Sequence, residues 1–175
     1  MGRCFAVVSR LAALVALVSL GGSGCGKSRV HAPMTVWHDL PSGEAIARRE
    51  HRPALLFFMA EWSTADKMLE HETFPHPDVS RAMEGLVAIR VDMSDDERKE
   101  TQLASARFEV KGVPTILVID DFDAYPRTFP AQPPWSPEPA ADLLRVNEFV
   151  EAPKLARMIR EAKGRAADRS RDRAH

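Results

Sequence analysis

Short apolar runs recur along the chain from about residue 35 onward. The clearest are Ala54–Ala60 and Thr115–Asp120, and Leu86–Met93 is largely apolar as well. Runs of this length, bounded by proline, charge or turn residues, are typical of strands that are buried on both faces. Weaker patterns at Thr35–Leu40 and Val146–Val150 predict a first and a last strand. We therefore expect a sheet of four or five strands.

Segments with helical features separate these strands. A helix is expected from Ser42, which has the side chain of an N-cap residue, to His51. A second helix should begin at Ser63 and end before Pro75 and Pro77, because proline lacks the N–H group that a helix interior needs.

Two more helices are predicted further along the chain. Ser94 and Glu97 match a capping box, so a helix is expected from there through Phe108. Pro153 is suited to a helix start, and it leads into Lys154–Ala162, where apolar residues recur at helical spacing.

The order of these elements is strand, helix, strand, helix, strand, helix, strand, strand, helix. Such alternation indicates an α/β domain with a central mixed sheet flanked by helices. We assign this domain to residues 35–163. Within it, six prolines between residues 125 and 139 predict a polyproline-like surface loop. Residues 164–175 are highly charged and lack apolar periodicity, so they are expected to form a disordered tail.

Residues 1–24 have the layout of a secretory signal peptide. Arg3 and Arg10 precede an apolar run over residues 11–20, which is followed by small residues. Ten residues make about 15 Å of helix, which is too short for a hydrocarbon core of roughly 30 Å. We therefore expect an exported protein rather than one with a membrane span here.

Cys25 follows the small residues directly, and this arrangement resembles a bacterial lipoprotein signal. The resemblance implies that Cys25 is acylated, that residues 1–24 are removed, and that residues 25–34 tether the domain to a membrane. Gly22 departs from the aliphatic residue usual at that position, so an ordinary signal peptide cut nearby is the alternative. Gly26, in place of an aspartate, favours the outer membrane where the cell has one.

Composition narrows the remaining classes of function. The chain has 175 residues, of which 45% are hydrophobic, and this suffices for one domain with a real core. Its formal net charge of -1 gives no indication of a nucleic-acid partner. The only two cysteines are Cys4 and Cys25, so residues 26–175 contain no thiolate nucleophile and no internal disulfide.

Neither a cofactor nor a metal is expected. The sequence at 21–28 matches a Walker A pattern, but Pro33 interrupts the helix that should follow a phosphate-binding loop. His71, His76 and Asp78 fit no standard spacing of metal ligands, and we expect them in a solvated loop.

Several ordered blocks of sequence resemble the thioredoxin superfamily. They are Pro53–Val79, Phe108–Asp120 with its Gly112-Val113-Pro114-Thr115 turn, and more weakly Arg145–Ile159. The likeness is greatest to the C-terminal thioredoxin-like domain of DsbD-type thiol–disulfide interchange proteins. It implies a thioredoxin-like fold, with a cis peptide bond before Pro114.

The resemblance also implies a site that has lost its chemistry. Ser63 and Asp66 stand where the redox family has its two cysteines, and Phe57 stands where many members carry a buried acid. Ser63 and Asp66 are expected to act as a capping-box-like pair at a helix start. The alternative is that Trp62, Ser63, Val113 and Pro114 line a groove that binds a peptide or another ligand.

The sequence therefore favours a redox-inactive, non-enzymatic binding or assembly module. Its partner would be an envelope protein or peptide, and its membrane contact would be the lipid anchor on the periplasmic or outer side. The alternative is a thiol–disulfide interchange enzyme that operates despite the substitutions, or an accessory subunit of one.

Overall fold

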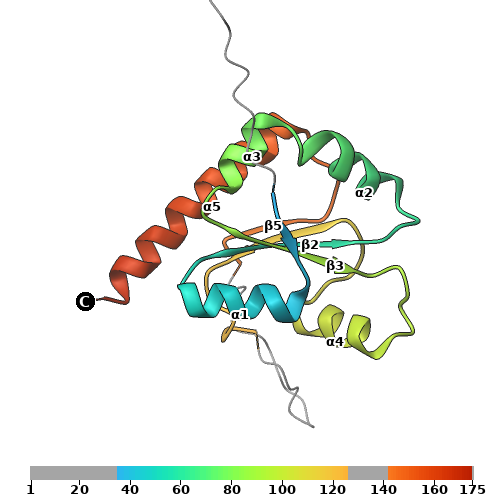
Figure 1. Ribbon diagram of the computed structural model, residues 1–175, viewed down its shortest axis with the longest axis horizontal. Coiled ribbons are helices and arrows are strands. Elements are labelled where there is room, and N and C mark those ends of the chain that lie inside the picture. Colours follow the sequence, from blue (N-terminus) through green and yellow to red (C-terminus); the bar gives the residue numbers. More distant parts are fainter. Residues whose placement is uncertain (1–34, 126–141, 175) are drawn as a thin grey trace, which may run out of the picture. The chain divides into compact units, whose positions relative to one another are not determined.

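A five-stranded mixed sheet forms the centre of the domain in the computed structural model, which describes residues 35–125 and 142–174 (Figure 1). The predictions for the signal peptide, the tether, Cys25 and the proline-rich loop lie outside the described residues. The strand order is β1-β3-β2-β4-β5, with β3 parallel to β1 and β2, and β4 antiparallel to β2 and β5. The strands are β1 Trp37–His38, β2 Ala54–Met59, β3 Val87–Asp92, β4 Thr115–Ile119 and β5 Leu144–Val146.

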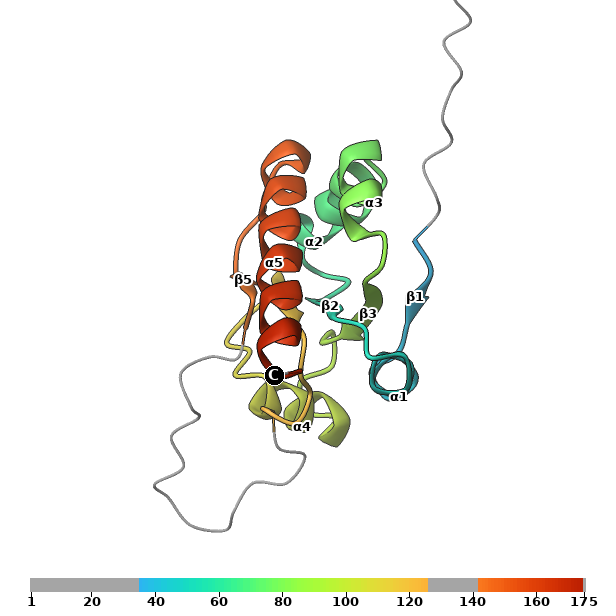
Figure 2. The ribbon, with the colours of Figure 1, turned by 90° about the vertical axis from the view of Figure 1, so that its left-hand side faces the viewer.

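Helices cover both faces of this sheet, as Figures 1 and 2 show. One face carries α1 (Leu40–Glu50) and α4 (Lys99–Arg107). The other carries α2 (Thr64–Met68), the π-helical turn η1 (Leu69–Thr73), α3 (Pro77–Met83) and α5 (Ala152–Asp172). The predicted α/β fold, a central mixed sheet flanked by helices, is confirmed.

Alternate side chains of β2 serve two separate cores. Leu55 and Phe57 pack with α3 and α5, whereas Leu56 and Phe58 pack with α1 and α4. All four side chains are fully buried. A strand buried on both faces has no polar side to alternate with, which is why β2 is a continuous apolar run. Gly43 lets α1 approach the sheet, because a Cβ there would lie 2.4 Å from Ile89.

Several predicted boundaries are wrong. The first strand is only two residues long, because α1 already begins at Leu40. Its N-cap is Asp39, whose carboxylate accepts from the backbone N–H of Ser42 at 2.8 Å, so Ser42 is not the cap. The last strand is Leu144–Val146 rather than Val146–Val150.

The helices between the strands also differ from the prediction. The capping box at Ser94 and Glu97 does not form, since α4 begins at Lys99 and the Ser94 hydroxyl bonds elsewhere. The sequence-based prediction missed α3, which starts at Pro77, where proline is well suited to the first turn.

The predicted disordered tail at 164–175 is the largest error, because α5 continues to Asp172. Ala162 and Ala166 extend the buried stripe of Leu155 and Ile159 at helical spacing. Alanine contributes little hydrophobicity, so the stripe is hard to recognise among charged residues. Farther along the helix, Arg169 contacts the carboxylate of Asp120 at 3.4 Å.

Within residues 35–125 and 142–174, no helix is both long enough and apolar enough to cross a membrane.

Candidate functional site

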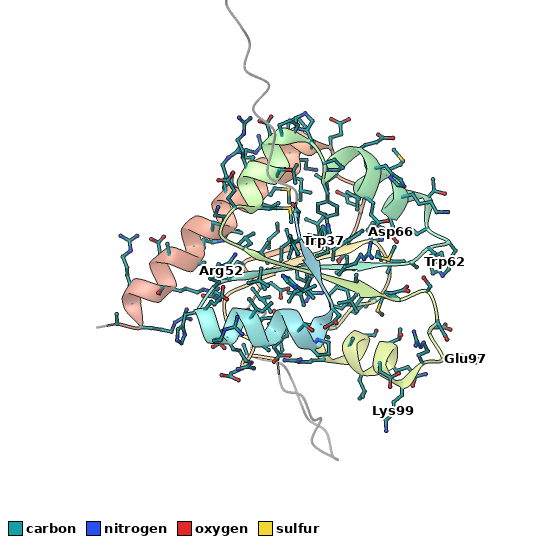
Figure 3. The ribbon with its side chains drawn as sticks, viewed as in Figure 1. Trp37, Arg52, Trp62, Asp66, Glu97 and Lys99 are labelled. Carbon is teal, nitrogen blue, oxygen red and sulfur yellow. The ribbon has the colours of Figure 1, made fainter. Side chains whose placement is uncertain are left out.

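The sheet brings two of the predicted site segments to the same edge. Strand β2 runs antiparallel to β4, with Phe58 opposite Thr115, so the end of β2 lies beside the start of β4. The turn that carries Trp62 and Ser63 therefore shares this edge with Pro114. Figure 3 shows Trp62 and Asp66 at this end of the domain, away from Arg52. The peptide bond before Pro114 is cis, as the resemblance implied.

Three hydrogen bonds hold the turn between β2 and α2. The Ser63 backbone N–H donates to the Ala60 carbonyl at 3.0 Å. The Asp66 backbone N–H donates to the Ser63 hydroxyl at 3.3 Å, so the predicted N-cap at Ser63 is confirmed. The reciprocal half of a capping box is absent, because the Asp66 carboxylate accepts from Ala60 N–H at 2.8 Å rather than from Ser63.

Asp66 is fully buried, which the sequence reasoning did not anticipate. Its Oδ2 has the Ala60 bond, but its Oδ1 is buried and has no hydrogen-bond partner among the described residues. Burial raises the pKa of the Asp66 carboxyl, and the negative charge of Glu70 raises it further. Hydrogen bonds from the Ala60 backbone and the Ser63 side chain act in the opposite direction and lower it. The signal in the sequence is its spacing, since residues 66, 69 and 73 fall on one helical face and Leu69 and Thr73 are buried.

Phe57 contributes an aromatic cluster in place of an acid. Its ring lies 4.9 Å from that of Phe74 and 6.0 Å from that of Trp37, centroid to centroid. Trp37 and Phe74 in turn meet edge to face at 5.0 Å. This position therefore offers packing and no proton acceptor.

Trp62 projects from the turn and is 69% exposed. The neighbouring residue, Glu61, is held in place by a hydrogen bond from its backbone N–H to the Ser94 hydroxyl at 2.8 Å. Ser94 donates in turn to the carboxylate of Asp92, and this bond lowers the pKa of that carboxyl. The loop after β3 thus holds the base of the turn while leaving the Trp62 indole free to contact solvent.

An open hollow of about 390 Å³ lies beside the loop before Pro114. Two residues of its lining are linked by Thr115, whose hydroxyl contacts the Gly112 carbonyl at 2.6 Å and the Asn147 amide oxygen at 3.2 Å. The lining residues are Glu109, Lys111, Gly112, Val113, Arg145 and Asn147. Of the four residues of the groove hypothesis, Val113 lines this hollow, whereas Trp62, Ser63 and Pro114 do not.

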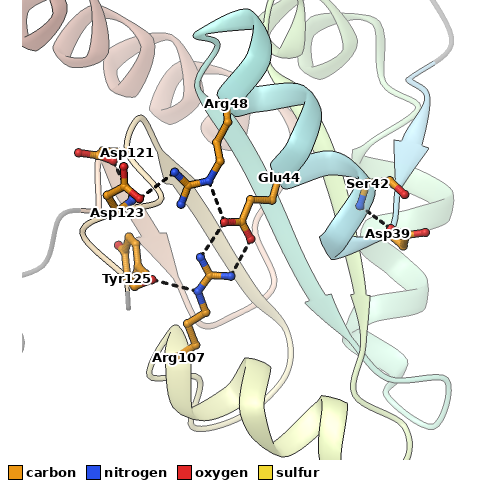
Figure 4. Close-up of polar contacts among 8 residues, drawn as sticks. All are labelled: Asp39, Ser42, Glu44, Arg48, Arg107, Asp121, Asp123 and Tyr125. Carbon is orange, nitrogen blue, oxygen red and sulfur yellow. Dashed lines mark hydrogen bonds and ion pairs between the residues drawn. The ribbon is translucent and has the colours of Figure 1, made fainter. Parts of the chain in front are cut away.

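A buried ion cluster at Glu44 was also missed (Figure 4). The Glu44 carboxylate accepts two bonds from Arg107, at 2.7 and 3.0 Å, and a third from Arg48 at 2.9 Å. Arg48 also reaches Asp123 at 2.7 Å, and Arg107 Nε donates to the Tyr125 carbonyl at 3.1 Å. The cluster ties α1 to α4 and to the loop after β4, so its role is to position these elements.

The described residues contain no group of three or more His, Cys, Asp or Glu side chains placed to hold a metal ion. His76, one of the three residues considered for such a site, accepts from the backbone N–H of Asp78 at 3.2 Å and caps α3.

Comparisons with known proteins agree with this fold. No family model matches the chain. The thiol:disulfide interchange protein DsbD of Cronobacter sakazakii is 31% identical over 112 residues, which cover 64% of this chain and 17% of that protein. The chain thus corresponds to less than a fifth of that relative.

Two solved structures share the fold at low sequence identity. A thioredoxin from Thermus thermophilus matches with a TM-score of 0.54 at 19% identity, covering 73% of this chain and 87% of its own. The reduced C-terminal domain of Neisseria meningitidis DsbD matches with a TM-score of 0.52 at 17% identity, covering 73% and 99%.

Proposed function

We propose that this chain, a member of the thioredoxin-like superfamily, is a redox-inactive binding or assembly module of the cell envelope. The observation that supports this most is the state of Asp66. A buried carboxyl, bonded to the backbone of its own turn, occupies the position where the resemblance implies the second cysteine. Thiol–disulfide exchange needs a thiolate that attacks sulfur through a mixed disulfide. From residue 26 onward the only sulfur in the chain belongs to methionine.

The binding surface we favour is the edge where the Trp62 turn and the loop before Pro114 lie side by side. Trp62 supplies an exposed aromatic ring, and Val113 supplies one wall of the open hollow. Aromatic side chains combine a large apolar area with a polar N–H, which suits them to contacts with a protein or peptide. We expect the partner to be an envelope protein or peptide.

An insulin-reduction assay with dithiothreitol tests the loss of redox chemistry. Residues 26–175 should give no rate above that of dithiothreitol alone, because the polypeptide has no thiol to form the mixed disulfide. A thioredoxin with both cysteines serves as the positive control in the same buffer. A rate above the background would overturn the proposal.

Anchoring through Cys25 is the second part of the proposal. Its support is the short apolar run ending in small residues just before this cysteine. Mass spectrometry of the mature protein should find acylated Cys25 at the N-terminus, with more than one chain, because a single chain binds membranes only marginally. An unmodified N-terminus elsewhere, or a Cys25→Ser protein that still sediments with membranes, would contradict it.

A role in thiol–disulfide interchange is the second candidate, and the names of the curated relatives favour it. Without a thiol in its domain, the chain would act as an accessory subunit to an enzyme that has one. In that case it should raise the turnover of the partner enzyme in a reconstituted mixture. The two candidates differ in this readout, since a pure assembly module leaves that turnover unchanged.

A further inference from the structure

The Asp66 carboxyl lies at the centre of the turn that presents Trp62. One oxygen accepts from Ala60 N–H at 2.8 Å, across the whole turn, while the backbone N–H of the same residue donates to Ser63. The side chain is fully buried and its second oxygen has no partner among the described residues. The hydrogen bond from Ala60 therefore depends on the Asp66 carboxyl, whose negative charge is poorly compensated by its surroundings.

The surrounding charges do not neutralise Asp66. Glu70 of η1 is the charged group that acts on it, and it is itself paired with Arg90 of β3 at 2.9 Å. On α2, Lys67 is exposed and forms no ion pair with Asp66 in the described structure. Other acids near this turn include Glu61 of the turn itself and Asp92 at the end of β3, and both are exposed.

Burial of an ionised carboxyl without a paired charge is unfavourable, whereas its neutral form is tolerated far better. We propose that Asp66 makes the turn between β2 and α2 pH-dependent: the neutral carboxyl keeps the turn closed, and ionisation loosens it and changes how Trp62 is presented. This pH dependence is separate from the proposed binding function and requires no partner.

The raised pKa of Asp66 fixes the direction of the effect. The ordinary carboxyl pKa is 3.8, and at lower pH the carboxyl is neutral whether the turn is closed or open. Between this ordinary value and the higher pKa of the closed state, the carboxyl of the open state is ionised while that of the closed state is still neutral, so the open state gains population as the pH rises. The ratio of closed to open turns falls by up to about tenfold per pH unit in this window and then levels off.

Hydrogen exchange of the full chain between pH 4 and 8, corrected for the intrinsic pH dependence, measures this ratio directly. The amides of Ala60, Ser63 and Asp66 are the reporters, because each donates one of the hydrogen bonds that close the turn. Their protection in the wild-type protein should fall several-fold from the acidic to the alkaline end.

Three variants separate Asp66 from other groups. Asp66→Asn keeps an oxygen for Ala60 but cannot ionise, so protection of the turn should change less than twofold across the range. Glu70→Gln removes the neighbouring negative charge and should move the transition to lower pH. Asp78→Asn, on α3, alters an exposed carboxylate paired with Arg81 and should behave as the wild type does.

Carbon-13 titration of the Asp66 carboxyl completes the test. It should titrate above the ordinary value for aspartate. The inference is overturned if the carboxyl titrates at or below that value, or if the wild-type protein and Asp66→Asn lose protection of the turn equally as the pH rises. Because neither measurement involves a partner, failure here leaves the proposed binding function standing.

Discussion

Glu44 and Arg107 form a buried two-point ion pair, with nitrogen–oxygen distances of 2.7 and 3.0 Å. The pair joins α1 to α4 on the face of the sheet opposite Asp66. The Arg107 guanidinium also lies 4.8 Å from the centre of the Phe108 ring. Removal of one partner from such a pair is strongly destabilising, because the other partner is left as a buried charge without compensation.

We expect Arg107→Met to lower the free energy of unfolding by about 3 kcal/mol. The lower end of the usual range applies because Arg48 still contacts Glu44 at 2.9 Å. Chemical denaturation at pH 7 measures the change. Arg81→Ala is the matched control, since its pair with Asp78 is exposed and its loss should leave stability nearly unchanged. A loss equal to that of the control would show that the buried pair does not hold the helices.

The second half of α5 is expected to stabilise the domain, although the sequence suggested a disordered tail. Deletion of residues 164–175 removes the buried Ala166 and the two arginines, Arg169 and Arg173, that contact Asp120. The Asp120 side chain is only 5% exposed, so it would lose its partners in a poorly solvated position. Thermal unfolding should show a loss of roughly 2 kcal/mol.

Two further variants decide how that loss should be interpreted. Arg171→Ala alters an exposed pair with Asp168 on the same helix and should leave the melting temperature unchanged. Ala166→Asp should reproduce much of the loss without shortening the chain, because it buries a charge on the packed face. If the deletion costs nothing, the final helical turns do not pack on the domain in solution.

The strands could be predicted from the sequence because a strand buried on both faces needs apolar side chains at nearly every position and therefore forms a continuous apolar run. Leu55, Phe57, Ile116 and Val118 all lie in strands as their apolar runs predicted. Helix starts were less predictable, since more than one residue near a start can have a side chain suited to the N-cap position. Asp39 caps α1 although Ser42 has an equally suitable side chain, and only the packing of the helix on the sheet decides between them.

Two local features of the candidate site could be predicted, and the burial of Asp66 could not. The sequence predicted a helix start at Ser63, and the resemblance to the thioredoxin superfamily implied a cis bond before Pro114; the structure has both features. The depth of Asp66 was not predictable from its chemistry, because aspartate in a first turn is usually exposed. Only its spacing of three residues from Leu69 indicates that Asp66 is buried. That spacing places both residues on one helical face, which predicts burial only once α2 is known to pack on the sheet.

Under the proposed function, Trp62→Ala should weaken capture of an envelope partner while leaving the fold intact. The side chain is 69% exposed, so its removal should change stability by less than about 0.5 kcal/mol. Affinity capture from the native envelope, compared between the two proteins, measures the effect. Leu103→Ala is a useful control, because that residue is also exposed but lies on α4. Equal capture by all three proteins would remove the support for a binding surface at Trp62.

Restoration of the cysteine pair tests whether the scaffold of the redox family is intact. In the double variant Ser63→Cys, Asp66→Cys, the thiol introduced at position 63 would lie at the N-cap of α2. Unpaired backbone N–H groups at a helix start stabilise a thiolate there, so the pKa of that thiol should be lowered. The second thiol can then resolve the mixed disulfide. Insulin reduction should therefore rise above the background of the unmodified domain.

The rate should nevertheless remain well below that of an active thioredoxin. Phe57 packs against Trp37 and Phe74 and offers no carboxylate to move the proton from the second thiol. A third substitution, Phe57→Asp, would supply an acid but would also bury a charge among aromatic rings, so it should destabilise the fold.

The single variant Ser63→Cys is the matched control, since it has a nucleophile and no resolving thiol. Activity in the double variant but not in this control would show that only the missing pair silences the site. Equal, background rates in both would mean that the turn between β2 and α2 differs from that of the redox family in more than its two missing thiols.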